Sequence, residues 1–288
     1  MPKKIKEESK KDIINWIKPR LNGEDGLGGI FPAMVNALIA FKTLDETKFK
    51  SEISTIQKSI DNLIVEKKNH AYCQPCVSPV WDSGWMGIVN IENNIPTDDL
   101  ANWFLKKEIK IKGDWAEEKE IDPAGWAFQY NNDYYPDVDD TALVGMFLDR
   151  YYKKNKDKRI LDCIERTRSW IIGMQSKNGG WGAFDIDNNK SYLNSIPFAD
   201  HGALLDPPTV DVSARCISFL KQLNRPEDKA VIEKGLKYIL ENQEMDGSWY
   251  GRWGTNYIYG TWSTLCAINL IDFENKEKII EKASNYLK

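Results

Sequence analysis

The chain has 288 residues, of which 42% are apolar and 28% are charged, and 39 basic against 43 acidic residues give a formal net charge of −4. Because lysine and glutamate are interspersed and form no basic block, we expect no nucleic acid partner. The longest apolar stretch, residues 31–41, is interrupted by Asn36 and is shorter than the roughly 18 residues that indicate a membrane span.

The first residues and the number of cysteines indicate the cellular compartment in which the chain works. The first residues are rich in lysine and glutamate and lack the apolar centre of a secretory signal. Five cysteines, an odd number, fit a reducing compartment better than a disulfide framework. We therefore expect a cytoplasmic chain. Cys73 and Cys76 form a C-x-x-C pair, but no second pair exists and His70 and His201 are the only histidines, so we expect no metal site and no cofactor.

Apolar residues recur at helical spacing through most of the chain. From Phe49 to Leu63 they follow at intervals of four and three residues, which places them on one side of a helix. Similar patterning predicts helices at 32–44, 100–111, 139–152, 158–174, 210–223, 227–242 and 257–273. With about nine or ten helices and little strand-like alternation, the pattern predicts an all-α fold.

Several predicted helices end in the same type of loop. Residues 175–181 and 243–249 both run from a glutamine through a glycine to a tryptophan, and weaker relatives occur at 22–28 and 122–126. We interpret them as marking a two-helix unit repeated about four times, in which neighbouring pairs cover each other's apolar faces. The glutamine amide would bond groups at helix ends and the indole would cover them. No linker rich in Pro, Gly or Ser interrupts residues 1–288, so we predict a single domain.

An aspartate cluster is the most unusual local feature. Asp137, Asp139 and Asp140 follow Pro136 at the predicted start of a helix, where aspartates usually serve as caps. The functional alternative starts from repulsion, because two carboxylates about 4 Å apart repel by roughly 4 kcal/mol at an effective dielectric near 20. Such a cluster retains a proton, and the helix N-terminus stabilises the carboxylate that remains once the proton has left. It would suit a substrate without a nitrogen or oxygen atom to protonate.

Aromatic residues occupy similar glycine-rich loops. They are Trp81, Trp126, Phe128, Tyr130, Phe184, Trp253, Tyr257 and Tyr259. Each ring face attracts a cation by about 0.5 to 2 kcal/mol, so an acid beside them suits carbocation chemistry. Packing in the core is the simpler explanation for any one of them.

Five segments resemble the bacterial squalene-hopene cyclase family and occur in the family's order. They are residues 74–82, 125–142, 180–185, 206–208 and 246–257, and the resemblance covers nearly all of residues 20–270. It implies an α/α toroid. It also implies class II cyclisation, in which a buried aspartic acid protonates a terminal double bond of squalene and pentacyclic triterpenes form through carbocations.

The resemblance also implies roles for individual positions. Asp139 resembles the proton donor, with Asp137 and Asp140 as its carboxylate neighbours, while Asp211 and Arg215 match the pair that supports the acid. The positions that match the substrate pocket and its entrance are Trp81, Phe128, Phe184, Trp253, Tyr257, Ile30 and Pro32. No metal ligand is implied.

Members of this family are longer, with an inserted second barrel domain and a further C-terminal repeat, which we expect to be absent here. Three functions stay open: a squalene-hopene cyclase-like chain, active or partial; a class II cyclase of a shorter isoprenoid; and a non-catalytic isoprenoid-binding scaffold. Prenyltransferase β subunits also build α/α barrels, but neither histidine suits their zinc site. The partners we expect are squalene, the cytoplasmic membrane surface through peripheral contact, and a complementary polypeptide.

Overall fold

The computed structural model describes residues 3–23, 25–116, 120–195 and 204–288. These residues form eleven α-helices and four short strands, which confirms the all-α prediction. The helices are α1 Lys3–Ile17, α2 Phe31–Asp45, α3 Lys50–Asp61, α4 Pro79–Glu92, α5 Asp98–Lys107, α6 Val138–Asn155, α7 Lys158–Gly173, α8 Val210–Leu223, α9 Lys229–Glu241, α10 Tyr257–Ile268 and α11 Lys276–Leu287. The strands pair antiparallel, β1 Leu21–Asn22 with β2 Gly26–Leu27 and β3 Ile64–Glu66 with β4 Ala71–Cys73. None of the helices in the described ranges is long and apolar enough to cross a membrane.

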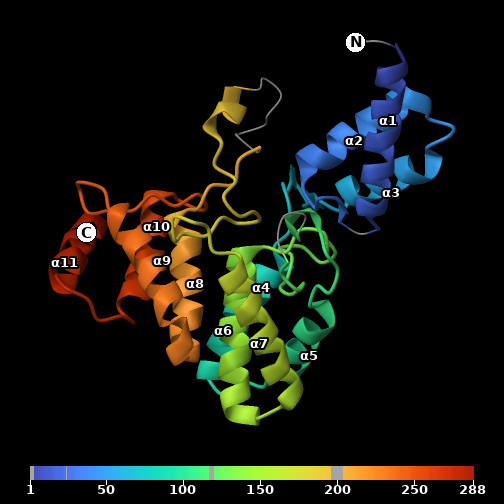
Figure 1. Cartoon of the computed structure of the whole chain (residues 1–288). Coiled ribbons are helices and arrows are strands. Elements are labelled where there is room, and N and C mark those ends of the chain that lie inside the picture. Colours follow the sequence, from blue (N-terminus) through green and yellow to red (C-terminus); the bar gives the residue numbers. More distant parts are fainter. Residues whose placement is uncertain (1–2, 24, 117–119, 196–203) are drawn as a thin grey trace. The chain divides into compact units, whose positions relative to one another are not determined.

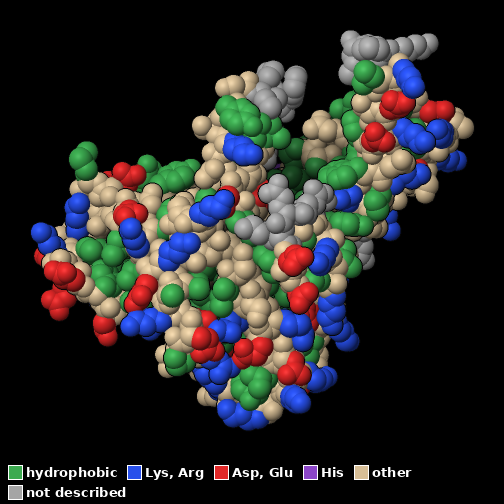
Figure 2. Space-filling view, viewed as in Figure 1, with side chains coloured by type: hydrophobic (Ala, Val, Ile, Leu, Met, Phe, Trp, Pro, Cys, Tyr) green, Lys and Arg blue, Asp and Glu red, His purple; other side chains and the backbone are tan. Residues whose placement is uncertain are grey.

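Two compact units make up the described chain. Unit 1 contains residues 1–82 and 127–135, and unit 2 contains residues 83–126 and 136–288. Helices α1 to α3 belong to unit 1 and α5 to α11 to unit 2, while α4 begins in unit 1 and continues into unit 2 (Figure 1). On the face seen in Figure 2, lysine and arginine side chains are interspersed with aspartate and glutamate.

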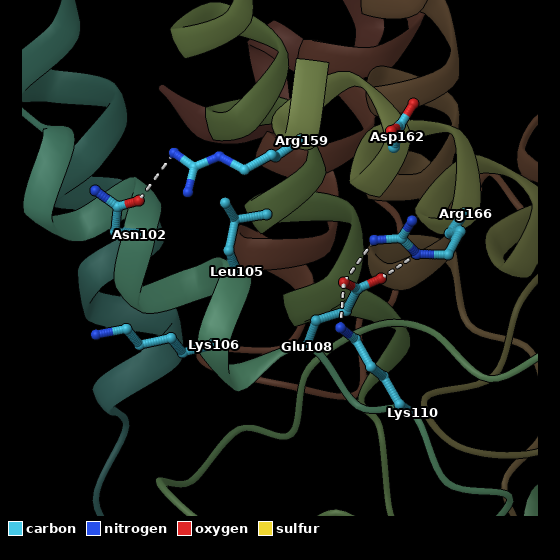
Figure 3. Close-up of a pocket in the computed structure, with 8 residues that line it drawn as sticks. All are labelled: Asn102, Leu105, Lys106, Glu108, Lys110, Arg159, Asp162 and Arg166. Atoms are coloured by element: carbon cyan, nitrogen blue, oxygen red, sulfur yellow. Dashed lines mark hydrogen bonds and ion pairs between the residues drawn. The ribbon is translucent and has the colours of Figure 1, made fainter. Parts of the chain in front are cut away.

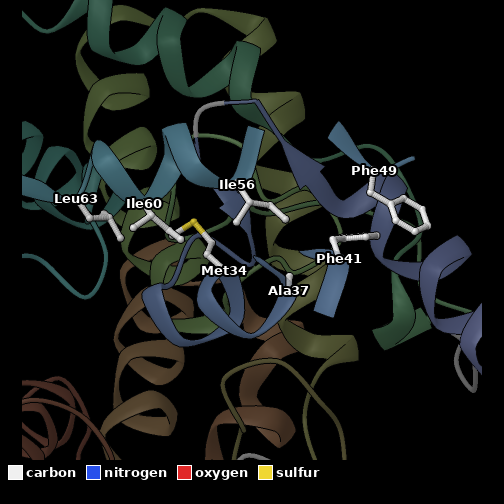
Figure 4. Close-up of a cluster of buried hydrophobic side chains, with 7 residues drawn as sticks. All are labelled: Met34, Ala37, Phe41, Phe49, Ile56, Ile60 and Leu63. Atoms are coloured by element: carbon white, nitrogen blue, oxygen red, sulfur yellow. The ribbon is translucent and has the colours of Figure 1, made fainter. Parts of the chain in front are cut away.

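The core of unit 1 lies between α2 and α3 (Figure 4). Its rings Phe41 and Phe49 lie 4.9 Å apart between centroids. The periodic residues predicted from Phe49 onward point into this core, since Ile56 and Ile60 are both buried in it. The segment at 22–28, which the sequence pattern predicts to be a weak repeat loop, instead contributes to the β1–β2 hairpin.

Unit 2 has the inner and outer helix layers of an α/α toroid. Successive inner helices α6, α8 and α10 pack against one another, and each packs against the outer helix that follows it, α7, α9 and α11. Helix α4 joins the inner layer because two glycines let it approach α6 closely. A Cβ at Gly84 would lie 2.9 Å from Leu143, and one at Gly87 would lie 2.6 Å from Phe147. Larger residues at these positions would force the two helices apart.

Three tryptophan loops link the layers of unit 2 in the same way. The indole N–H groups of Trp126, Trp181 and Trp249 donate to carbonyls in the last turns of α5, α7 and α9, at 2.8, 2.7 and 2.8 Å. Their backbone N–H groups donate to hydroxyls of the next inner helix, at 3.0, 2.9 and 2.9 Å; these belong to Thr141, Ser213 and Thr261. Each loop therefore fixes the end of an outer helix and the start of an inner one.

The loop glutamines add a second link. The amide of Gln175 donates to the carbonyls of Gly179 and Val231, at 2.9 and 3.0 Å, and Gln243 repeats this with Gly247 at 3.0 Å and Ile279 at 3.5 Å. Val231 and Ile279 lie in α9 and α11. The predicted structural role of these glutamine–tryptophan loops is confirmed.

Candidate active site

The aspartate cluster begins α6, as the sequence predicts. One Asp137 carboxylate oxygen accepts the backbone N–H groups of Asp139 and Asp140, at 2.8 and 3.1 Å, so Asp137 is the helix N-cap. Asp137 thus has the capping role weighed above, and its carboxyl group also lies beside the proposed donor. All three aspartates are buried, with exposed fractions of 6% or less.

Asp139 is held by side chains from two other inner helices. Its Oδ1 accepts a hydrogen bond from Arg215 Nε of α8 at 3.2 Å, and its Oδ2 accepts one from the Tyr259 hydroxyl of α10 at 3.4 Å. Asp139 is 4% exposed and Arg215 only 2%. The expected juxtaposition of the acid with Arg215 is therefore present, and both carboxylate oxygens have a donor.

Burial raises the pKa of Asp139 to about 6, which Arg215 opposes and the nearby Asp211 reinforces. Burial and the charge of Asp139 also raise the pKa of Asp137, against the two backbone N–H bonds that it accepts. The two carboxyls interact, so they titrate as a pair. A raised pKa lets a carboxyl group keep its proton to a higher pH than a free aspartate does, which favours its action as an acid catalyst.

Asp211 completes the acidic surroundings one helical turn before Arg215. It is fully buried, and its Oδ2 accepts the backbone N–H of Trp253 at 3.1 Å. Asp211 and Arg215 lie on the same side of α8, as the spacing predicts. Through Trp253, Asp211 also connects this helix to the loop before α10.

Asp206 organises two loops next to these residues. Its carboxylate accepts the backbone N–H groups of Ala183, Phe184 and Asp185, at 3.2, 2.6 and 2.7 Å, and a hydrogen bond from Arg252 at 2.6 Å. The sequence singled out Asp206 only as part of a motif. Its role as an anchor depends on contacts between distant segments, which sequence spacing does not reveal.

The aromatic positions expected in unit 2 differ in their surroundings. Phe184 is half-buried, whereas Trp253 and Tyr257 are 40% and 41% exposed. Trp126, which the loop pattern also placed near the acid, is fully buried against Phe104, with ring centroids 6.1 Å apart. Trp126 is therefore a packing residue at the end of α5, where its indole N–H donates to the carbonyl of Phe104.

The remaining pocket positions belong to unit 1. Trp81 and Phe128 are half-buried, and the Phe128 carbonyl accepts the N–H of Val80 at 3.5 Å. Ile30, the residue before α2, is 40% exposed, and Pro32 lies exposed in the first turn of that helix. Their contribution to a substrate pocket stays a prediction.

A surface pocket of about 370 Å³ lies elsewhere in unit 2, between α5 and α7 (Figure 3). Its lining is charged, and Glu108 and Arg166 form a two-point ion pair across it, with N–O distances of 2.6 and 2.7 Å. It contains none of the predicted site residues. A hydrocarbon would gain nothing from such a lining, so we do not assign the substrate to this pocket.

Tyr259, one of the loop aromatics expected beside the acid, does bond to Asp139. Two further residues near the acid were not predicted from the sequence. Trp85 of α4 and Trp262 of α10 both lie against the guanidinium of Arg215, at 4.7 and 5.1 Å from the ring centroids. The spacing of Tyr259 and Trp262 by three residues places them on one side of a helix, which is the one signal the sequence offered.

The ranges that the structure describes contain no group of three or more His, Cys, Asp or Glu side chains arranged to hold an ion. Cys73 is exposed on β4 and Cys76 is partly buried. His201 lies outside the described residues.

Fold and site together define an α/α-repeat protein with a buried, proton-retaining carboxyl group at the start of an inner helix. Comparisons with known proteins identify the family. The model of the squalene-hopene cyclase C-terminal domain matches residues 77–288, and that of the N-terminal domain matches residues 1–69. The chain belongs to the squalene-hopene cyclase family.

Individual members of this family are similar to the chain over most of its length. The chain is 49% identical over 283 residues to the squalene-hopene cyclase of Schizosaccharomyces japonicus, covering 93% of this chain and 42% of the relative. It is 44% identical over 294 residues to that of Bradyrhizobium diazoefficiens, covering 99% of this chain and 44% of the relative. The chain thus spans less than half the length of these relatives. Among solved structures, the apo form of the type II terpene cyclase MstE from Scytonema has a TM-score of 0.47 at 16% identity, covering 77% of this chain and 57% of that chain.

Proposed function

We propose that this chain provides the acid site of a class II cyclase that protonates squalene and starts its cyclisation to pentacyclic triterpenes. The observation that carries the proposal is Asp139, a buried carboxyl group with a raised pKa whose two oxygens face Arg215 and Tyr259. The names of the relatives support squalene as the substrate.

In the first step, the O–H bond of Asp139 breaks and its proton forms a C–H bond with one carbon of a terminal double bond. The electron pair of that double bond makes the new bond, so the other carbon becomes a cation. The O–H electrons stay on Asp139 as a carboxylate. Attack by the next double bond of squalene then forms the first ring, and the positive charge moves to a carbon further along the squalene molecule.

Arg215 and Tyr259 stabilise the carboxylate that this step creates. Their donors already lie at 3.2 and 3.4 Å from its oxygens, so little rearrangement is needed when the negative charge appears. Burial has the opposite effect, because it keeps the proton on Asp139 at rest. This balance raises the fraction of Asp139 that carries a proton before the reaction, and it stabilises the carboxylate that the reaction leaves.

The proposal is tested by incubating the purified chain with squalene in detergent and analysing the products by mass spectrometry. We expect a pentacyclic product that Asp139→Asn abolishes, while Asp162→Asn, a change at a lining residue of the remote charged pocket, leaves it intact. Product formation by Asp139→Asn equal to that of the unchanged chain refutes the assignment. Conversion of geranylgeranyl diphosphate in place of squalene would favour the shorter-isoprenoid alternative.

We also propose that the chain works in the cytoplasm and meets its substrate through peripheral contact with the cytoplasmic membrane face. The support is chemical: squalene is a hydrocarbon that dissolves in the bilayer. Flotation with phospholipid vesicles tests the contact. Recovery of the chain only in the lipid-free fraction would contradict it.

A complementary polypeptide is the second partner that we propose. It is supported by an apolar stripe on α10. Ile258, Trp262 and Cys266 follow one another at intervals of four residues, and all three are exposed within unit 2. Mixing the chain with the unmatched part of the Schizosaccharomyces relative should increase product yield. Equal yield with and without that part would contradict the proposal.

A further inference from the structure

The guanidinium of Arg215 lies against two indole rings. Its central carbon is 4.7 Å from the ring centroid of Trp85 and 5.1 Å from that of Trp262. The two rings are 5.8 Å apart and inclined by 50°, so they form a V with the cation over both faces. We call Trp85 and Trp262 the indole pair.

The position of the indole pair matters because Arg215 is almost completely buried. A long arginine side chain has many rotamers, and only some of them direct Nε toward Asp139. The hydrogen bond to Asp139 is long, at 3.2 Å, and Arg215 also hydrogen-bonds to Tyr259. Two aromatic faces restrict the guanidinium plane as well as attract its charge.

Trp262 also contacts the second donor to the acid. Its ring centroid lies 5.6 Å from that of Tyr259, with an angle of 45° between the planes. Both groups that hydrogen-bond to Asp139, the guanidinium of Arg215 and the ring of Tyr259, therefore contact Trp262. The guanidinium contacts Trp85 as well. The indole pair itself comes from α4 and α10, so it connects two helices to the acid of α6 and the arginine of α8.

We propose that Trp85 and Trp262 are positioning residues that hold the guanidinium of Arg215 against Asp139. They act through Arg215 and need no contact with the reacting atoms. This inference rests on the proposed function, because it concerns the acid that this function uses. Without the indole pair, Arg215 would turn away whenever Asp139 is protonated and would be missing when the carboxylate forms.

The consequence for titration follows from the groups around Asp139. Asp137 faces it as the N-cap of α6, Asp211, Arg215 and Cys216 from α8, and Tyr259 from α10, while the residue that α4 places against Arg215 is the uncharged Trp85. Arg215 is the one cation in this set and lowers the pKa of Asp139. Release of Arg215 should therefore raise it, by about one unit for an opposite charge lost from contact distance.

The test measures the carboxyl group directly and needs no turnover. Infrared difference spectra between each variant and the same variant carrying Asp139→Asn report the protonated fraction of Asp139 against pH in the full chain. We expect Trp262→Leu and Trp85→Leu to raise the pKa of Asp139. Trp262→Phe, which keeps an aromatic face, should leave it nearly unchanged. Trp103→Leu on α5 is the matched control and should have no effect.

Repeating the tryptophan changes in an Arg215→Met chain shows whether the pKa shift of Asp139 depends on Arg215. Any water admitted by the smaller side chain acts in both backgrounds, whereas the path through Arg215 exists only in one. We expect no further shift in the Arg215→Met chain. Equal shifts in both backgrounds, or no shift in either single variant, overturns the inference.

Trp262→Leu can also fail to fold, which circular dichroism would show, and Trp85→Leu then carries the test. Product formation from squalene is measured separately on the same preparations. A shifted pKa without any turnover would refute the proposed function and leave the positioning role standing. Turnover in the unchanged chain without a shift in the pKa of Asp139 in the variants would refute the positioning role and leave the proposed function standing.

Discussion

Replacing Asp206 by asparagine should strongly destabilise the chain. The carboxylate accepts three backbone N–H groups and the Arg252 guanidinium, and it is 4% exposed. An asparagine of the same size keeps one acceptor oxygen and turns an NH₂ group toward donors. The negative charge that balances Arg252 is lost as well.

The magnitude follows from the number of bonds. A hydrogen bond to a charged group contributes about 1.5 to 3 kcal/mol, and breaking a buried ion pair costs about 3 to 5 kcal/mol. We expect Asp206→Asn to lower the free energy of unfolding by about 4 kcal/mol. Arg252→Met leaves the three N–H bonds of Asp206 in place, and Arg252 is 27% exposed at its side chain, so about 1 kcal/mol is expected.

Urea unfolding followed by far-ultraviolet circular dichroism checks both values, provided that the slope against denaturant stays constant. Asp162→Asn is the matched control, a charge-removing change in the same unit away from these loops. The reasoning is refuted if Asp206→Asn costs less than about 1 kcal/mol, the level of an exposed ion pair. It is also refuted if Arg252→Met costs more than Asp206→Asn.

Three further predictions concern protonation, the tryptophan loops and the thiols. Because the pKa of Asp139 is raised from 3.8 to about 6, the folded state binds its proton more tightly; stability should fall by up to about 3 kcal/mol as pH rises from about 3 to about 7. Unfolding midpoints measured across that range should show the fall, and Asp139→Asn should reduce it, leaving the part that the raised pKa of Asp137 contributes. Ser213→Ala removes the hydroxyl that accepts the backbone N–H of the second loop tryptophan and should cost about 1 kcal/mol in urea unfolding; a loss no larger than that of Ser284→Ala would contradict the role of this bond. Burial raises the pKa of Cys163 to about 12 and that of Cys216 as well, so both should resist alkylation in the native chain while the exposed Cys73 reacts, which mass spectrometry of labelled peptides would show or contradict.

Helical periodicity predicted most elements of unit 2 but not all. The helix expected at 210–223 coincides with α8, and that at 158–174 ends one residue early as α7. Helix α4 was not predicted. Its glycines at 84 and 87 weaken the helical signal, and their value lies in the close approach to α6, which is a property of the packed chain. Helix α10 ends at Ile268, five residues before the predicted end.

For the site, the sequence could indicate which residues carry charge but not which of them meet. The aspartates at the start of α6 and their capping role followed from local spacing. The pairing of Asp139 with Arg215 came from the family resemblance, because 76 residues separate them. Nothing local distinguishes Trp85 or Trp262 from core tryptophans, since their contact with Arg215 requires α4, α8 and α10 to be placed side by side.

The repeated loops place the site residues of α6, α8 and α10 within one turn of a fixed connection to the preceding tryptophan loop. Thr141, Ser213 and Thr261, the hydroxyl residues that accept the tryptophan backbone N–H groups, each lie two residues from Asp139, Arg215 and Tyr259 respectively. The hydrogen bond between each tryptophan loop and the next inner helix therefore fixes the position of that helix along its axis. The bond lies within one turn of the residue that the helix contributes to the site. A shift of one helix along its axis would separate the donors from Asp139 by 1.5 Å for each residue of slip. The structural repeat and the acid are thus one arrangement, in which the loops that stabilise the fold also set the distances on which proton transfer depends.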